Sequence, residues 1–489
     1  MNGKTLRNRT ISGVFWSGAN QFGMFTSAII TSIILARLLE PEDFGLIAMV
    51  NIIIEFARII VSFGFGQALI QKQGITEKDL STVFWFNAGL GLITTFIVAF
   101  SASYVASFYN EPELQFITIV LSFNFLIYSL NVVQRIIFIK AIDFKSIAKV
   151  EIMATIVSGF SSVLLAYWGY GVWSLVFQTL TMAIISCVLL WYLSEWKPKM
   201  IFDWQSIRDI WGFSINLFGS QSLKYWTGNI DKVLIGKYLS GSALGLYRQA
   251  YVVVLNPINR IGQVIMQVLF PTFAKIQEDR NLVRNIFLKL NRITALVTFP
   301  LMVGMFVCSD TFVRSLLGPK WISIIPILKI FSCIGLVSSI NELFKSIFLG
   351  LGYSNLLFKV GLFERFTLIG GVVIGLNWGI EGVALGLLAA ALVNLPVVMY
   401  YGGGIINLSV VKQLTNLFPI LFTALIMGAL VWCVNLQLSQ FNELKKIVIL
   451  AIDVFAGVFS YGLLAYIFKL KAFYNFLELI APYAKAFQK

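Results

Sequence analysis

The chain has 489 residues, of which 58% are hydrophobic and only 12% are charged, and its formal net charge is +14. A soluble protein of this length would be about a quarter charged, so the composition argues against an ordinary soluble enzyme. The lysines and arginines gather in alternate loops between apolar runs instead of in one patch. This distribution argues against nucleic acid as a partner and is the positive-inside pattern of membrane proteins.

Apolar runs of about 20 residues, the length that crosses the ~30 Å hydrocarbon core of a bilayer, follow one another along the whole chain. The sequence therefore predicts an all-α polytopic membrane protein with about fourteen transmembrane helices. The expected spans are residues 12–36, 44–66, 81–107, 114–138, 149–167, 171–193, 210–235, 245–270, 287–312, 323–349, 357–377, 380–402, 414–436 and 446–468.

The charged loops predict which way the chain is threaded through the membrane. Even-numbered loops carry lysines such as Lys72, Lys140 and Lys197, whereas the loops at 41–43 and 110–113 are acidic. Basic loops face the cytoplasm. Both termini are therefore expected on the cytoplasmic side, and the C-terminal tail, with Phe473, Phe476, Leu477, Ile480 and Phe487 at helical spacing, is expected to lie on the membrane surface as an amphipathic helix.

One loop sequence occurs twice. Residues 34–46 (ILARLLEPEDFGL) and 234–246 (LIGKYLSGSALGL) share Leu39, Gly45 and Leu46 as Leu239, Gly245 and Leu246, and an Asn-x-Phe-Gly precedes each copy. Chance similarity between two hydrophobic hairpins is the alternative. A duplication predicts two six-helix lobes of like topology, with a substrate site between them. The expected parts are an N-lobe at 1–193, an interfacial connector at 194–208, a C-lobe at 209–403, and spans 13 and 14 with the tail at 404–489.

The chain offers few residues for metal or redox chemistry. It has no histidine, and its four cysteines, Cys187, Cys308, Cys333 and Cys433, all lie within apolar runs. This pattern indicates neither a disulfide framework nor a metal site. No cofactor is expected.

Three stretches resemble the polysaccharide flippases of the multidrug/oligosaccharidyl-lipid/polysaccharide exporter superfamily, in its fourteen-span branch. They are residues 37–46 (RLLEPEDFGL), 229–251 (NIDKVLIGKYLSGSALGLYRQAY) and 268–277 (VLFPTFAKIQ). The resemblance implies two six-helix lobes plus two added spans. It also implies movement of an undecaprenyl-pyrophosphate-linked oligosaccharide across a bacterial inner membrane for polysaccharide biosynthesis, with membrane lipids, a polymerase and export machinery as partners.

Ionisable residues inside spans are the candidate site, because each costs ~2.5–3.5 kcal/mol at a helix centre. Under the repeat, Arg58 and Arg260 occupy matched depths in equivalent spans and would converge on a central cavity, where arginine suits phosphate oxygens. A self-neutralising pair of Glu55 with Arg58 is the alternative. The expected pyrophosphate-binding residues are Arg58, Arg260, Lys224 and Arg248, and the expected sugar contacts are Asn20, Gln21, Tyr225, Trp226 and Asn229.

The energy source and three rival functions stay open at this point. Asp231 or Glu55 could bind a proton or a sodium ion for coupling, or the membrane potential could drive the cycle. A polysaccharide polymerase would need a placed base or metal-binding carboxylates, and the chain has no histidine and no Asp-x-Asp. A drug exporter of cations would prefer an acidic cavity. A lipid II flippase handles a pyrophosphate too, and only the motif resemblance separates it.

Overall fold

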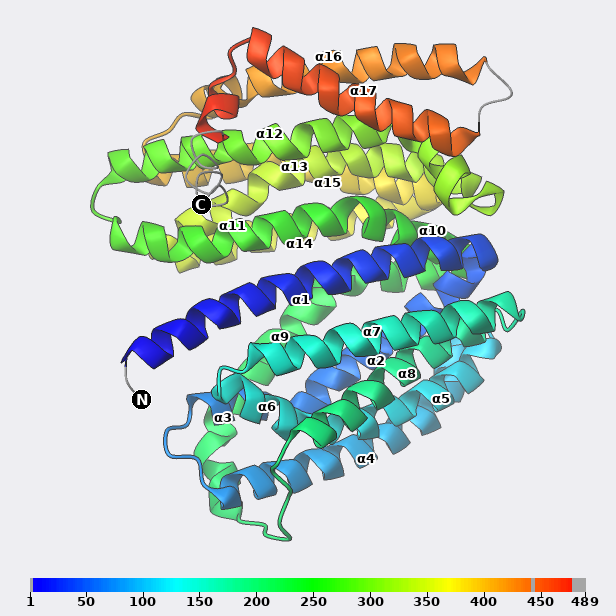
Figure 1. The fold of residues 1–489 in the computed structure, drawn as a ribbon, viewed down its shortest axis with the longest axis vertical. Coiled ribbons are helices and arrows are strands. Elements are labelled where there is room, and N and C mark those ends of the chain that lie inside the picture. The colour runs from blue at the N-terminus through cyan, green and yellow to red at the C-terminus, as the bar shows by residue number, and fades with distance from the viewer. Residues whose placement is uncertain (1–2, 441–444, 477–489) are drawn as a thin grey trace. The chain divides into compact units, whose positions relative to one another are not determined.

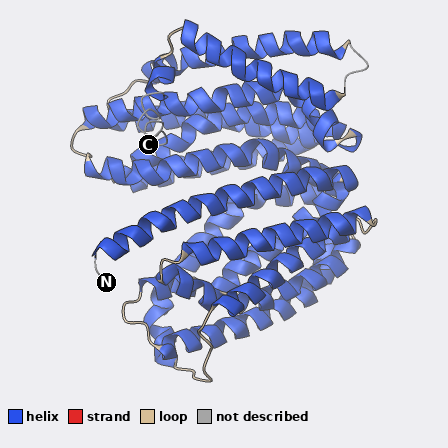
Figure 2. Ribbon diagram, in the orientation of Figure 1, coloured by secondary structure: helices blue, strands red, loops and turns tan. Residues whose placement is uncertain are grey.

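The computed structural model describes residues 3–440 and 445–476, and every regular element within them is helical (Figure 2). The described residues contain fourteen long helices, which agree with the predicted spans and confirm the fold class. Ten segments of this described part are long and apolar enough to cross a membrane, and one of them, residues 354–405, holds two long helices, α14 (Ser354–Gly375) and α15 (Gly379–Ile405). Of the predicted amphipathic tail, Leu477, Ile480 and Phe487 lie outside the described residues.

The chain divides into two compact units, residues 1–245 and 246–489. In the first unit, α4 packs against α5, α7 packs against both α1 and α8, and α2 contacts α4, α5, α8 and α9 (Figure 1). The helices of this unit are α1 (Gly3–Leu38), α2 (Pro41–Ser62), α3 (Phe65–Gln71), α4 (Glu77–Tyr109), α5 (Glu113–Ser129), α6 (Val132–Lys140), α7 (Phe144–Tyr167), α8 (Val172–Leu193) and α9 (Trp204–Tyr238), followed by the first half of α10 (Gly241–Ala250).

Local sequence signals set the ends of these helices. Pro41 opens α2, with Glu42 and Asp43 in its first turn, where acidic side chains complement the helix dipole. Thr76 and Asp79 form a reciprocal capping box at the start of α4. The span predicted at 44–66 is broken near its end, because Phe63 and Gly64 both take positive φ values, 40° and 75°, and separate α2 from α3.

Helix α9 packs within the first unit, against α2, α3 and α4. In the sequence-based scheme of lobes, α9 is the first span of the C-lobe at 209–403. The lobe boundaries stay a prediction.

The second unit is centred on α13, which packs against α11, α12 and α15, while α12 also contacts α16 and α17. Four helices contain an internal proline, and such residues are tolerated in membrane helices because neighbouring groups satisfy the freed backbone. The elements are the π-helical turn Tyr251–Leu255, α11 (Asn256–Lys275), α12 (Arg280–Phe312), a second π-helical turn Val313–Leu317, α13 (Ile325–Gly350), α14 (Ser354–Gly375), α15 (Gly379–Ile405), α16 (Val410–Ser439) and α17 (Lys446–Ile467).

The core of the second unit runs along α12, α13 and α16. Phe287, Phe344 and Phe348 lie in one buried cluster with Met427 and Ala465, which come from α16 and α17. The last two helices are therefore joined to the rest of this unit by apolar packing.

Candidate functional site

Arg58 on α2 is held by three neighbours inside the first unit. Its Nη1 donates to Glu55 Oε1 at 2.8 Å, its Nη2 lies 3.5 Å from Asn124 Oδ1 on α5, and its guanidinium carbon lies 5.5 Å from the centre of the Tyr128 ring. The Arg58 side chain is 31% exposed and that of Glu55 is 50% exposed. The pair with Glu55, which is the alternative left open by the sequence, is thus formed, and the guanidinium keeps donors that an anion could use.

Aromatic side chains lie on the adjoining faces of α2 and α9. The ring of Phe56 lies 6.0 Å from that of Tyr225 and 5.0 Å from that of Trp226. The Tyr225 hydroxyl donates to the Ile52 carbonyl oxygen at 2.7 Å, which fixes α9 against α2. Trp226 remains 39% exposed. Two of the predicted sugar contacts, Tyr225 and Trp226, therefore pack against α2, the helix that carries Arg58.

The other predicted residues of α9 are polar and differ in burial. Asn229 donates to the Tyr225 carbonyl oxygen at 2.9 Å and accepts from Lys232 Nζ at 2.7 Å. Lys224 is exposed, whereas Asp231 is buried at 8% exposure. The roles of Lys224 in phosphate binding and of Asp231 in ion coupling stay predictions.

Asn20 takes part in a polar contact that the sequence pattern did not indicate. Its Nδ2 donates to Glu151 Oε2 at 2.5 Å, and Glu151 Oε1 lies 2.5 Å from Arg135 Nη1, so one carboxylate joins α1, α6 and α7. Gln21 is exposed beside Asn20. Arg135 and Glu151 were missed because both lie close to the ends of predicted spans, where a charge is unremarkable.

The remaining predicted cations, Arg248 and Arg260, belong to the second unit. Arg248 on α10 is partly buried and Arg260 on α11 is exposed. Their convergence with Arg58 on one cavity stays a prediction. Two other lysines of this unit have neighbours that balance their charge. Lys345 Nζ forms an ion pair with Glu342 Oε1 at 2.5 Å, and Lys329 lies over the Phe306 ring.

The two copies of the repeated loop meet within the first unit, and their glycines explain why. A Cβ atom placed on Gly45 would collide with the Gly241 carbonyl oxygen, and one on Gly245 would collide with that of Pro41. The first turn of α2 and the first turn of α10 therefore cross backbone to backbone. Both loops keep glycine at this position because only glycine permits that approach. We call residues 41–46 with 241–245 the glycine crossing.

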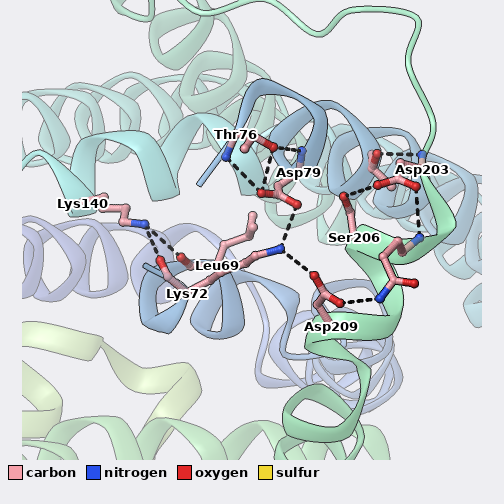
Figure 3. Close-up of polar contacts among 10 residues, drawn as sticks. Leu69, Lys72, Thr76, Asp79, Lys140, Asp203, Ser206 and Asp209 are labelled. Atoms are coloured by element: carbon pink, nitrogen blue, oxygen red, sulfur yellow. Dashed lines mark hydrogen bonds and ion pairs between the residues drawn. The ribbon is translucent and has the colours of Figure 1, made fainter. Parts of the chain in front are cut away.

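Charged side chains fasten the opposite end of α9 (Figure 3). Lys72 Nζ lies 3.0 Å from both Asp79 Oδ1 on α4 and Asp209 Oδ2 on α9. Burial opposes the charged form of Lys72, but the bonds to the two carboxylates outweigh it and raise the pKa of this lysine. Ser206 Oγ donates to Asp203 Oδ2 at 3.0 Å, and the Thr82 hydroxyl oxygen accepts from the Asp203 N–H at 3.0 Å. Lys140 Nζ donates to the carbonyl oxygens of Leu69 and Lys72.

The long apolar helices of both units define a polytopic membrane protein, and one of its membrane-crossing segments, residues 41–71, carries Arg58. Residues 34–326 match the family described as "Polysaccharide biosynthesis protein", and because this match covers more than half of the chain, the chain belongs to that family. The family inferred from the motifs is thereby confirmed.

Three similar proteins are named for the biosynthesis or transport of polysaccharides. The teichuronic acid biosynthesis protein TuaB of Bacillus subtilis is 28% identical over 94% of this chain and 95% of its own length. The lipopolysaccharide biosynthesis protein WzxC of Escherichia coli is 28% identical over 80% of each chain. The succinoglycan biosynthesis transport protein ExoT of Rhizobium meliloti is 25% identical over 76% of this chain and 75% of its own.

Solved structures show the same fold. The lipid II flippase MurJ, in an inward closed conformation, matches 93% of this chain and 98% of its own with a TM-score of 0.74 at 16% identity. A multidrug resistance transporter of the MATE family matches 78% of this chain and 94% of its own, with a TM-score of 0.59 and 14% identity. Family and fold together make this chain a polytopic membrane protein of the polysaccharide biosynthesis family, with the fold seen in MurJ.

Proposed function

We propose that this protein moves an undecaprenyl-pyrophosphate-linked oligosaccharide from the cytoplasmic to the outer leaflet of a bacterial cytoplasmic membrane. Membership of the polysaccharide biosynthesis family carries this proposal, and the names of the relatives TuaB, WzxC and ExoT support it. The lipid tail stays in the bilayer during this movement, and only the head group crosses. Neighbouring polymerase and export proteins then take up the product.

Arg58 is the proposed anchor for the pyrophosphate in the first unit. Its guanidinium already balances Glu55 at 2.8 Å and rests on the Tyr128 ring, so it is oriented before a substrate arrives. A planar guanidinium binds phosphate oxygens through two parallel hydrogen bonds. Trp226, 39% exposed, offers an aromatic face to the sugars from the adjacent helix. Arg260 and Arg248 are the proposed counterparts in the second unit.

The test is flipping of a lipid-linked oligosaccharide by the purified protein in proteoliposomes. Arg58→Ala and Arg260→Ala abolish flipping, while Arg58→Lys retains part of the rate because it keeps the charge and loses only the fork. Arg314→Ala is the matched control, since Arg314 is engaged by Asp310 at 2.9 Å. Normal flipping by both alanine variants would overturn the role of the arginines. Transport of lipid II in place of the oligosaccharide would overturn the substrate assignment.

The proposal requires no catalytic step. The glycan recovered after flipping has the same length as the one supplied, whereas a polymerase would lengthen it. Collapse of the membrane potential is expected to slow the cycle, because moving one charge across the membrane is worth ~2.3 kcal/mol per 100 mV and a cationic empty cavity would be drawn inward. An unchanged rate would refute the contribution of the potential.

The proposed orientation places both termini in the cytoplasm. Single cysteines at position 42, in the first turn of α2, and at position 111, between α4 and α5, react with an impermeant thiol reagent added from outside. A cysteine at position 199 does not. The reverse labelling pattern would overturn the orientation.

A further inference from the structure

A carboxylate is buried where α12, α16 and α17 meet in the second unit. Asp453 on α17 is 1% exposed. The amide nitrogen of Asn435 on α16 donates to Asp453 Oδ2 at 2.5 Å and to the Thr311 hydroxyl oxygen on α12 at 2.8 Å. Three side chains from three helices therefore converge on one point within apolar spans.

One oxygen of this carboxylate has no partner among the described residues. Asp453 Oδ1 is buried and accepts no hydrogen bond. A carboxylate away from water needs a pairing cation, a set of donors or a bound proton, because desolvation strongly opposes its charge. The single bond from Asn435 is too little to meet that need. A cation or a proton bound by the carboxylate would meet it.

The charged groups nearby are engaged elsewhere or lie at the helix end. On α12, Asp310 pairs with Arg314 of the adjoining π-helical turn at 2.9 Å, and Cys308 is a buried thiol. On α16, Cys433 is exposed. On α17 itself, Lys446 stands at the first position of the helix, about 10 Å along the axis from Asp453 at 1.5 Å per residue. No ion pair is formed by Asp453 within the described part of the chain.

We propose that Asp453, Asn435 and Thr311 form a binding site for a monovalent cation, sodium or a proton. The oxygen and nitrogen of an asparagine amide are interchangeable in such an assignment. Turned over, the Asn435 side chain presents its carbonyl oxygen to the point that its nitrogen now occupies between Thr311 and Asp453. Carboxylate, amide and hydroxyl oxygens then face one ion from three helices. A proton on Asp453 satisfies the same carboxylate without turning the amide.

The site is distinct from Glu55 and Asp231, the two carboxylates expected to couple transport to an ion. It lies on α16 and α17, the two helices beyond the twelve of the repeat, and ties them to α12. Under the predicted topology the α16–α17 connection faces the outside. An ion would then enter from the outside, the side from which an inwardly directed ion gradient drives it. Binding itself does not depend on the proposed substrate.

The test measures binding and stability of the purified full-length protein in detergent. Radioactive sodium binding is measured, and thermal unfolding is followed in sodium chloride and in choline chloride at equal ionic strength, from mildly acidic to neutral pH. The variants are Asp453→Asn and Thr311→Val. Asp310→Asn is the matched control, since it removes an exposed carboxylate from the residue next to Thr311.

Saturable sodium binding, with a rise in Tm that Asp453→Asn abolishes and Asp310→Asn keeps, supports the site with sodium as the ion. Thr311→Val then weakens sodium binding by about tenfold or more, the usual scale for a lost supporting group. Stability that falls as pH rises, without a sodium effect, and an infrared band of a protonated carboxyl group that Asp453→Asn removes, support the site with a proton.

Wild-type protein that shows neither sodium binding nor a protonated carboxyl band overturns the proposal, whether or not Asp453→Asn folds. So does a wild-type dependence on sodium and pH that Asp453→Asn leaves unchanged. In either case the three side chains form only a polar contact between helices.

Discussion

Replacing Gly45 by alanine tests the glycine crossing, because the added methyl group has no space. A Cβ atom at Gly45 would meet the Gly241 carbonyl oxygen far inside the 3.0 Å that real Cβ atoms keep from other atoms. The shortfall exceeds an ångström at Gly45 and at Gly245. The obstructing atoms belong to the backbone, so rotation of a side chain cannot relieve the clash, and α2 and α10 must move apart.

The expected cost is about 1–3 kcal/mol, the usual range for overpacking, and more if the backbone cannot shift. Gly241→Ala is the matched control, since a Cβ atom there would have its nearest neighbour, Glu42 Cγ, at an ordinary 3.7 Å. Gly45→Ala should therefore lower the Tm and Gly241→Ala should leave it nearly unchanged. Gly245→Ala should resemble Gly45→Ala.

Separation of the crossing should also expose the residues beneath it. Met49 is fully buried, and its side chain lies under the crossing beside Gly236 and Tyr109. In a protein freed of its four native cysteines, Met49→Cys should be protected from an impermeant thiol reagent and should become reactive when Gly45→Ala is added. Equal Tm values and equal labelling for Gly45→Ala and Gly241→Ala would refute the reasoning.

Two further predictions concern charges at the two ends of α9. Lys72→Met removes both ion pairs of this lysine and leaves Asp79, 4% exposed, without its cation. The free energy of unfolding should therefore fall by about 1–3 kcal/mol, whereas Lys78→Met, at an exposed position, should not change it. Equal Tm values for the two variants would contradict this prediction. Near the glycine crossing, burial and the charges of Glu42 and Glu113 raise the pKa of Glu111. A carboxyl group whose pKa is higher in the folded than in the unfolded state stabilises the protein below the unfolded-state pKa, and this stabilisation is lost as pH rises through the folded-state pKa. The Tm should therefore fall from acidic toward neutral pH, and Glu111→Gln should flatten that part of the plot of Tm against pH. An unchanged plot for the variant would exclude Glu111 as the source of the fall.

Hydropathy predicted the helices, whereas the arrangement in two lobes was predicted from the repeated loop and from the family resemblance. Each expected span corresponds to a long helix. For the ten segments that are apolar enough to cross a membrane, the reason is that an apolar run of about 20 residues has no other stable state in a bilayer; α9 and α11 are not among these segments. The break at Phe63–Gly64 escaped prediction, since it depends on two left-handed backbone conformations inside an otherwise apolar segment. The Glu55–Arg58 pair, a contact within one helix, is the alternative that the sequence had left open beside a role of Arg58 in a cavity.

Contacts between residues far apart in the sequence could not be predicted from the sequence. Asp453 stands as the single acidic residue of its span, which is a visible signal, but Asn435 and Thr311 are 18 and 142 positions away in sequence and only packing joins them. Lys72 and Asp209 are similar, with 137 positions between them. A charge near a span end looks like an ordinary loop residue until its partner is known.

The repeated loop has a physical reason that also bears on α9. Helix α9 contacts the rest of the first unit at three points along its length. Asp209 forms an ion pair with Lys72, the Tyr225 hydroxyl donates a hydrogen bond to the Ile52 carbonyl oxygen, and Gly236 packs closely against Met49 and Tyr109. Helix α9 and the first turn of α10 therefore move with α2. The unit boundary falls after Gly245, shortly before the π-helical turn Tyr251–Leu255, a kind of irregularity often found at functional sites. Any transport cycle that separates the glycine crossing must break the backbone packing at Gly45 and at Gly245 together. Both copies of the loop therefore require glycine at this position for the same reason.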